Sequence, residues 1–101
     1  MHGLRTSILE LIRRTSVDLP EDVCRAIRAA AQEEEEQSAA STTLKTIWRN
    51  IELARQKNQP ICQDTGAVLF YVSAPHPLET AEFEREAREA VRSATEQGWL
   101  R

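Results

Sequence analysis

Only one stretch of this chain has the composition of a β-strand. Residues 67–74 form a short β-branched and aromatic run that is bounded by Gly66 and Pro75, and they predict a buried strand. A single strand cannot satisfy the hydrogen bonds of its own edges, and the rest of the sequence scarcely supplies a partner strand. We therefore expect these residues to be the leading part of a longer polypeptide, or to dock onto a partner or a second copy.

The other apolar residues recur at helical spacing. They predict helices near residues 3–16, from Pro20 into the glutamate run 33–36, from the cap-rich stretch 38–43 to about Asn58, and up to a stop at Gly98. The buried stripe of the second helix is predicted as Val23, Ala26, Ile27 and Ala30, and that of the third as Leu44, Ile47, Trp48, Ile51 and Ala54. The predicted fold class is α+β and predominantly helical, with about four helices and one buried strand after the Cys62 loop, as a fragment of a larger domain.

Composition narrows the class of protein. With 101 residues, 41% of them apolar, the chain is one domain at most. The net charge is −3 and the basic residues are scattered, which argues against nucleic-acid and membrane partners. The N-terminus lacks the apolar stretch of a signal peptide, so the expected compartment is the cytoplasm. There, Cys24 and Cys62 are expected to be reduced thiols or metal ligands.

The segment from Cys62 to Gly66 gathers the chemically useful side chains. It reads Cys-Gln-Asp-Thr-Gly and lies between the third predicted helix and the predicted strand. Cys62 offers a thiolate to a metal, Gln63 offers an amide and Asp64 a carboxylate. A lone cysteine is more often a small buried hydrophobe, and that alternative is the one we predict for Cys24, on the apolar side of the second helix.

The string Pro-Ile-Cys-Gln-Asp-Thr-Gly at residues 60–66, with the helix before it and the strand after it, resembles the N-terminal part of the class I fumarate hydratases. It is similar also to the alpha subunits of related iron–sulfur hydro-lyases, which include L-tartrate dehydratase. The similarity extends upstream to Leu19-Pro20-Glu21-Asp22-Val23 and downstream to Gly98. Residues 1–101 would then be the incomplete N-terminal portion of an alpha-type catalytic domain of an iron–sulfur hydro-lyase.

The resemblance implies a cofactor and roles for the residues of the loop. Cys62 would be one of three cysteines that hold a [4Fe-4S] cluster, and Gln63 and Asp64 would contact a four-carbon dicarboxylic acid. Asp64 is also the candidate catalytic residue, as a proton-transfer or positioning group. Fumarate/malate is the first choice of substrate and tartrate the second.

The remainder of the family's catalytic apparatus cannot be matched in this sequence. The other cluster cysteines and the substrate-clamping arginines have no counterpart here, so the expected partners are a further domain or a beta subunit, in a homo- or hetero-oligomer. This chain alone is not expected to be a competent enzyme.

Two alternatives remain open from the residues. Asp64-Thr65-Gly66 is also the signature of retroviral-type aspartic proteases, whose protomers are strand-rich barrels with several turn glycines, whereas this chain has only 3 glycines. The other alternative is a non-catalytic helical interaction module that presents the face from Leu44 to Ala54 to a partner.

Overall fold

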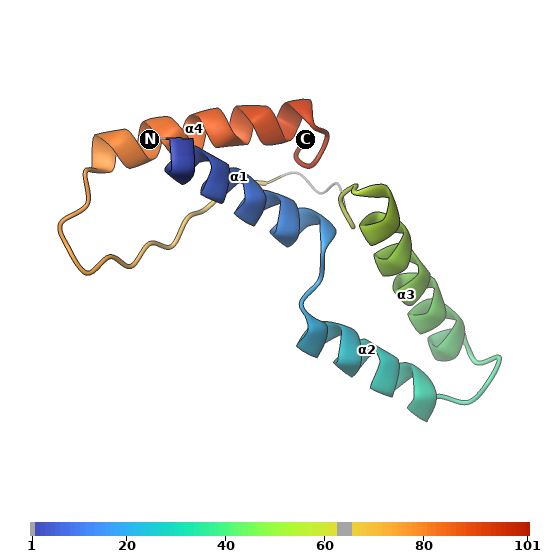
Figure 1. Ribbon diagram of the computed structural model, residues 1–101. Helices are drawn as coiled ribbons and strands as arrows, with labels where there is room; N and C mark the ends of the chain where they lie inside the picture. The colour runs from blue at the N-terminus through green and yellow to red at the C-terminus, as the bar shows by residue number, and fades with distance from the viewer. Residues whose placement is uncertain (1, 63–65) are drawn as a thin grey trace.

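Helices make up most of the protein. The computed structural model describes residues 2–62 and 66–101, and within these ranges the elements are α1 (His2–Val17), α2 (Glu21–Glu33), α3 (Ala39–Lys57) and α4 (Thr80–Glu96). α1 packs along α4 and α2 packs along α3, while α1 touches α3 more sparingly. Figure 1 shows these two helical pairs meeting where α1 and α3 end. The predominantly helical part of the predicted fold class is therefore confirmed.

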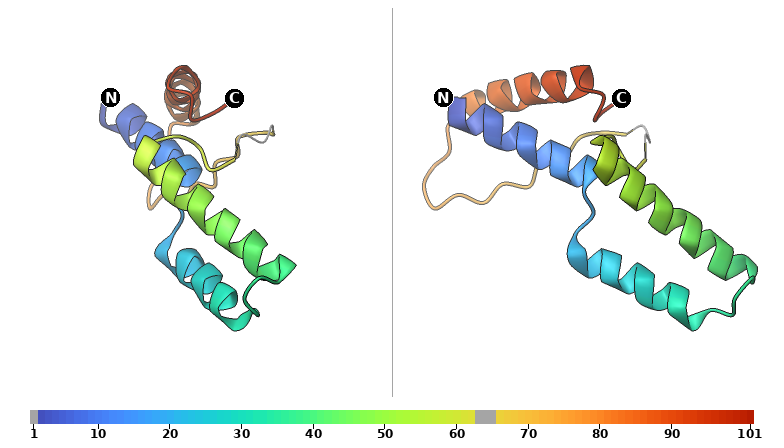
Figure 2. Two further views of the ribbon diagram at one scale, coloured as in Figure 1. Left: turned by 90° about the vertical axis from the view of Figure 1, so that its right-hand side faces the viewer. Right: turned by 45° about the vertical axis from the view of Figure 1, so that its right-hand side comes forward.

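The two helical pairs splay apart, so the molecule is elongated (Figure 2). Its radius of gyration is 17.1 Å and its extents are 53 × 30 × 22 Å. A compact domain of this length has a radius of gyration of about 13 Å. The main apolar cluster lies between α1 and α4, with Phe70 and the C-terminal residues packed against it, and its buried members are Ile8, Ile12, Ala87, Ala90 and Ala94.

The starts of α2 and α3 follow the sequence signals. Pro20 precedes the first residue of α2, and its carbonyl accepts a hydrogen bond from the Cys24 amide. The Ser38 side chain caps α3 by accepting a hydrogen bond from the Ser41 amide at 3.1 Å. α2 ends at Glu33, inside the glutamate run and without a basic residue in its last turn, as the carboxylates predict.

The ends of α3 and α4 also lie where the sequence places them. Asn58 adopts a left-handed conformation with φ 53°, and the Gln59 amide bonds back to the Ala54 carbonyl. Gly98 has φ +83°, which favours glycine, and the amides of Gly98 and Trp99 donate to the carbonyls of Thr95 and Ala94 in the last turn of α4. Both helices are thus stopped by their own backbone.

The predicted buried strand is wrong for this chain. Residues 66–74 run in an extended path without strand pairing, and no backbone hydrogen bond joins them to any other part of the chain that the structure describes. Leu69 is 70% exposed and Tyr71 is 93% exposed. Only Phe70 packs closely, edge-on to Phe83 with ring centroids 5.9 Å apart. The reason is physical, because extended backbone becomes a strand only when a neighbouring strand completes its hydrogen bonds.

The predicted buried stripe of α2 is also largely wrong. Val23 is 41% exposed and Ala26 and Ala30 are exposed, whereas Cys24 is fully buried. The helix has one neighbour, α3, and a single contact line can bury only a narrow part of its surface. On α3 the prediction succeeds for Ile51 and Ala54, which are 1% and 5% exposed. The C-terminal part of the face that the interaction-module hypothesis uses is therefore covered within the chain, whereas Ile47 is 41% exposed and Leu44 and Trp48 are half-buried.

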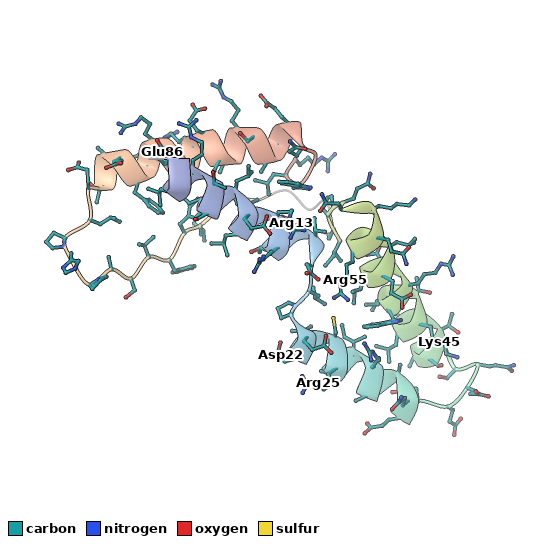
Figure 3. The ribbon with its side chains drawn as sticks, in the orientation of Figure 1. Arg13, Asp22, Arg25, Lys45, Arg55 and Glu86 are labelled. Atoms are coloured by element: carbon teal, nitrogen blue, oxygen red, sulfur yellow. The ribbon has the colours of Figure 1, made fainter. Side chains whose placement is uncertain are left out.

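An ion pair joins the helices of the first pair. The Arg5 Nε atom lies 2.8 Å from Glu86 Oε2, and Glu86 is only 6% exposed. Figure 3 places Glu86 where α4 crosses the start of α1. The hydrogen bond from Arg5 lowers the pKa of the Glu86 carboxyl, so the buried side chain stays charged and paired. Among the described residues, no helix is long and apolar enough to cross a membrane.

Candidate functional site

The path into the Cys62 loop is fixed at the end of α3. The Asn58 carbonyl accepts a hydrogen bond from the Trp99 indole Nε1 at 3.1 Å, which ties the end of α3 to the segment that follows α4. The Asn58 side chain accepts a second bond, from Arg13 of α1, at 3.2 Å. Asn58 is therefore held by residues from both ends of the chain.

Ile61, the residue before Cys62, is bonded to two helices at once. Its amide donates to the Ser16 carbonyl in the last turn of α1 at 2.8 Å. Its carbonyl accepts from the Asn50 side-chain amide of α3, with Nδ2 and O 2.9 Å apart. The first bond also satisfies a carbonyl that the end of α1 leaves without a helical partner. Both the backbone amide and the backbone carbonyl of Ile61 thus hold the chain in place.

Cys62 follows directly and is exposed, with its thiol free. It borders a pocket of about 390 Å³ that is lined by the end of α1 and by the C-terminal segment, with the residues Thr15, Ser16, Leu19, Ile61, Cys62, Trp99, Leu100 and Arg101. The structure therefore places this predicted site residue in a concave, accessible position. Gln63 and Asp64, the other two predicted site residues, lie outside the described residues, as does Thr65.

A charged cluster lies on α1 near this junction. Glu10 accepts hydrogen bonds from Arg13 at 2.7 Å and from Arg14 at 3.0 Å. These bonds, that from Arg13 foremost, lower the pKa of the Glu10 carboxyl to about 2. In turn, Glu10 raises the pKa of Arg13. Arg13 thus links a charged carboxylate to the Asn58 side chain at the entry to the loop.

Cys24 lies apart from this pocket, in the packing of α2 and α3. Its Sγ atom is 3.8 Å from the Leu19 carbonyl and 3.6 Å from the Arg55 Nη2 atom, and Arg55 also pairs with Asp18 at 2.8 Å. Its predicted packing role is confirmed, because the residue is 0% exposed. Within residues 2–62 and 66–101, no three His, Cys, Asp or Glu side chains come together as a metal site would need.

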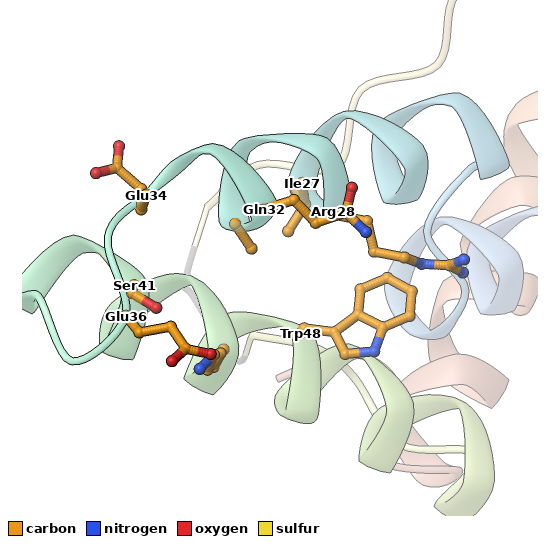
Figure 4. A pocket seen from close by; sticks show the side chains of 9 residues that line it. Ile27, Arg28, Gln32, Glu34, Glu36, Ser41 and Trp48 are labelled. Carbon is orange, nitrogen blue, oxygen red and sulfur yellow. The ribbon is translucent and has the colours of Figure 1, made fainter.

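A second pocket, of about 430 Å³, lies between α2 and α3. Figure 4 shows Ile27, Arg28 and Gln32 of α2 facing Trp48 of α3. The guanidinium carbon of Arg28 is 4.4 Å from the centre of the Trp48 ring, which is a cation–π contact, and the indole Nε1 donates to Glu52 at 2.9 Å. Trp48, predicted to be core, is therefore a half-buried pocket wall.

Trp99 and Asn50 were not identified by the sequence analysis as residues of the site. Trp99 packs on the α1–α4 cluster and its indole bonds to the Asn58 carbonyl. For Asn50 a signal was available. Asparagine is a poor helix former, and it stands in the middle of an otherwise well-patterned helix. An asparagine at such a position can indicate that its side-chain amide makes a specific hydrogen bond.

Comparison with known proteins agrees with the resemblance in the loop. The family model described as fumarate hydratase (Fumerase) matches residues 5–101. A putative class I fumarate hydratase from Geobacillus stearothermophilus is 39% identical over 101 residues, which are all of this chain and 20% of that protein. A putative L(+)-tartrate dehydratase subunit alpha from Methanocaldococcus jannaschii is 33% identical over 97 residues, 93% of this chain and 34% of that protein. The chain thus spans between a fifth and about a third of these relatives, and it belongs to the fumarate hydratase (Fumerase) family.

Proposed function

We propose that this chain is part of an iron–sulfur hydro-lyase that reversibly adds water to, or removes it from, a four-carbon dicarboxylic acid. Fumarate/malate is the proposed substrate pair, with tartrate as the second choice. The observation that carries the proposal is the free, exposed thiol of Cys62, which stands at the end of a segment bonded to α1 and α3 in a member of this family.

The donor chemistry of Cys62 fits an iron–sulfur cofactor. A thiolate is the protein ligand that such clusters use, and an exposed thiol on a fixed backbone can bind one without a rearrangement of the core. Cys24 does not fit, because it is fully buried in the packing of α2 and α3. We therefore assign a single cluster ligand to the described part of the chain. When bound, a [4Fe-4S] cluster with one open iron supplies a Lewis acid for the substrate hydroxyl.

The neighbouring residues are proposed to handle the substrate. The Gln63 amide would donate to a substrate carboxylate. The Asp64 carboxylate would accept a hydrogen bond from the substrate hydroxyl or take part in proton transfer. The other ligands and the residues that clamp the substrate would come from a further domain or a beta subunit. The proposed setting is the cytoplasm.

The test of the cluster assignment uses the complete protein as it is expressed, reconstituted without oxygen with iron and sulfide. We expect Cys62→Ser to reduce cluster uptake strongly while Cys24→Ser takes up the cluster as wild type does. Iron and sulfide content and the visible absorption spectrum measure the difference. Wild-type uptake by Cys62→Ser would show that the ligand assignment is wrong.

The role of Asp64 is tested in the same preparation. Asp64→Asn keeps the shape of the side chain but removes its charge and its basicity. We expect it to retain the cluster and to lose turnover by about 10²- to 10⁴-fold, the usual contribution of a positioned acid or base. Undiminished turnover would remove Asp64 from the catalytic role.

The protease alternative does not fit this fold. A retroviral-type protomer is a strand-rich barrel, whereas the part of the chain that the structure describes is helical and contains no strand. Far-UV circular dichroism is expected to show a helical spectrum, and a predominantly β spectrum would contradict both the structure and the hydro-lyase proposal.

A further inference from the structure

We infer that Asn50 is a positioning residue for the Cys62 thiol. The inference rests on the proposed function in one respect, which is that the positioned thiol serves as a cluster ligand. Asn50 lies on an exposed position of α3, yet its side-chain amide reaches the carbonyl of Ile61, with Nδ2 and O 2.9 Å apart.

The bond matters because of where it lies along the chain. The carbonyl of Ile61 and the nitrogen of Cys62 belong to the same planar peptide group. A hydrogen-bond donor at this oxygen therefore orients the peptide plane that leads into Cys62. The Ile61 amide, bonded to Ser16 at 2.8 Å, fixes the preceding peptide. Together the two bonds leave few backbone torsions free between α3 and the thiol.

The residues that precede Ile61 explain why a side-chain donor is needed at its carbonyl. Asn58 ends α3 with its left-handed conformation, and Pro60 has no amide hydrogen to donate. Ile61 is therefore the first residue after Pro60 that can be bonded through both its backbone groups, and it is bonded through both. An amide side chain donates to this carbonyl, whereas a carboxylate of the same size cannot donate and would repel it.

The test compares two variants with a matched control on the same helix. Asn50→Ala removes the amide, and Asn50→Asp keeps its shape but removes the donor. Gln56→Ala also truncates an exposed amide of α3, one that has no hydrogen-bond partner among the residues that the structure describes. Hydrogen exchange, measured on the complete protein, follows the Ile61 amide as the local probe and the Ile51 and Ala54 amides as probes of α3.

We expect both Asn50 variants to speed exchange at Ile61 by about three- to tenfold, the equivalent of one ordinary hydrogen bond. Gln56→Ala should leave the Ile61 amide unchanged, and the amides of α3 should exchange at the wild-type rate in all variants. Wild-type exchange at Ile61 in both Asn50 variants would overturn the inference. Equal acceleration throughout α3 would do the same, because it would reveal a general loss of stability.

A second readout follows the thiol itself. In the reconstituted protein, both Asn50 variants should shift the electron paramagnetic resonance spectrum and shorten the lifetime of the cluster against an iron chelator, while Gln56→Ala matches wild type. Unchanged spectra and lifetimes would show that Asn50 does not position a ligand. A failure of the proposed function would give a different result. In that case Cys62→Ser would assemble a normal cluster, while hydrogen exchange would still show that Asn50 holds Ile61.

Discussion

Glu10 is the residue whose charge state depends most plainly on its neighbours. Arg13 and Arg14 lower the pKa of its carboxyl from the ordinary 4.5 to about 2. A group whose pKa is lower in the folded state contributes stability above its ordinary pKa, and this contribution is lost as the pH falls through the folded value. For Glu10 the loss therefore occurs between about 4.5 and 2, and it is small because the side chain is partly exposed.

We predict that the Glu10 carboxyl titrates well below its ordinary range. Arg13→Ala should raise this pKa toward the ordinary value, and by more than Arg14→Ala does, because the bond from Arg13 is the larger cause. Nuclear magnetic resonance titration of the side-chain carboxyl carbon measures the shift. Arg88→Ala, which removes an exposed partner of Glu84 on another helix, should leave Glu10 unchanged. An ordinary pKa for Glu10 in wild type would contradict the ion-pair cluster.

At the scale of single residues, the sequence indicated Cys62 but not the residue that bonds to its neighbour. The thiol was found because it belongs to a short contiguous string. Asn50 and Trp99 act through hydrogen bonds to main-chain carbonyls, at Ile61 and Asn58, and neither bond leaves a regular spacing in the sequence. Contacts of this kind become visible only when the helix ends are placed in space.

At the scale of the elements, the packing of α2 against α3 depends on a few buried side chains. Ile51 is 1% exposed and Ile47, one turn earlier on the same helix, is 41% exposed. We predict that Ile51→Ala lowers the free energy of unfolding by about 2–5 kcal/mol, whereas Ile47→Ala changes it by about 0.5 kcal/mol or less. Denaturant titration measures both. Equal losses from the two variants would mean that α3 is buried differently.

Helix boundaries were predictable because the signals that set them are local. Pro20, Asn58 and Gly98 each act through their own backbone geometry, and each lies where a helix begins or ends. The buried faces were less predictable. The stripe proposed for α2 was sought by hydrophobicity, but which face is covered depends on where α3 lies, and this left Val23 in solvent and Cys24 inside. The missing strand has the same cause, since pairing depends on a distant partner.

At the scale of the whole molecule, the extended segment is the most exposed apolar feature. Leu69 is 70% exposed, Tyr71 is 93% exposed and Val72 is 50% exposed. Apolar extended backbone without partners is a template for association. We predict that Leu69→Lys and Tyr71→Lys each reduce self-association of the 101-residue chain without loss of helix content.

Analytical ultracentrifugation and circular dichroism measure these two properties. Ser73→Lys, which adds the same charge at an exposed polar residue of the segment, controls for net charge alone. If all three variants associate as wild type does, the segment is not the contact surface. If Ser73→Lys has the full effect, charge rather than apolar exposure explains the association.

The indole of Trp99 bonds to the carbonyl of Asn58 across 41 positions of sequence. During synthesis on the ribosome, the whole of α4 must therefore emerge before the end of α3 receives this partner. The carbonyl of Asn58, four residues before Cys62, is consequently among the last groups of this junction to receive its partner. A growing chain would present this thiol before the pocket that it borders is complete, so under the proposed function the timing of cluster delivery would matter as much as its location.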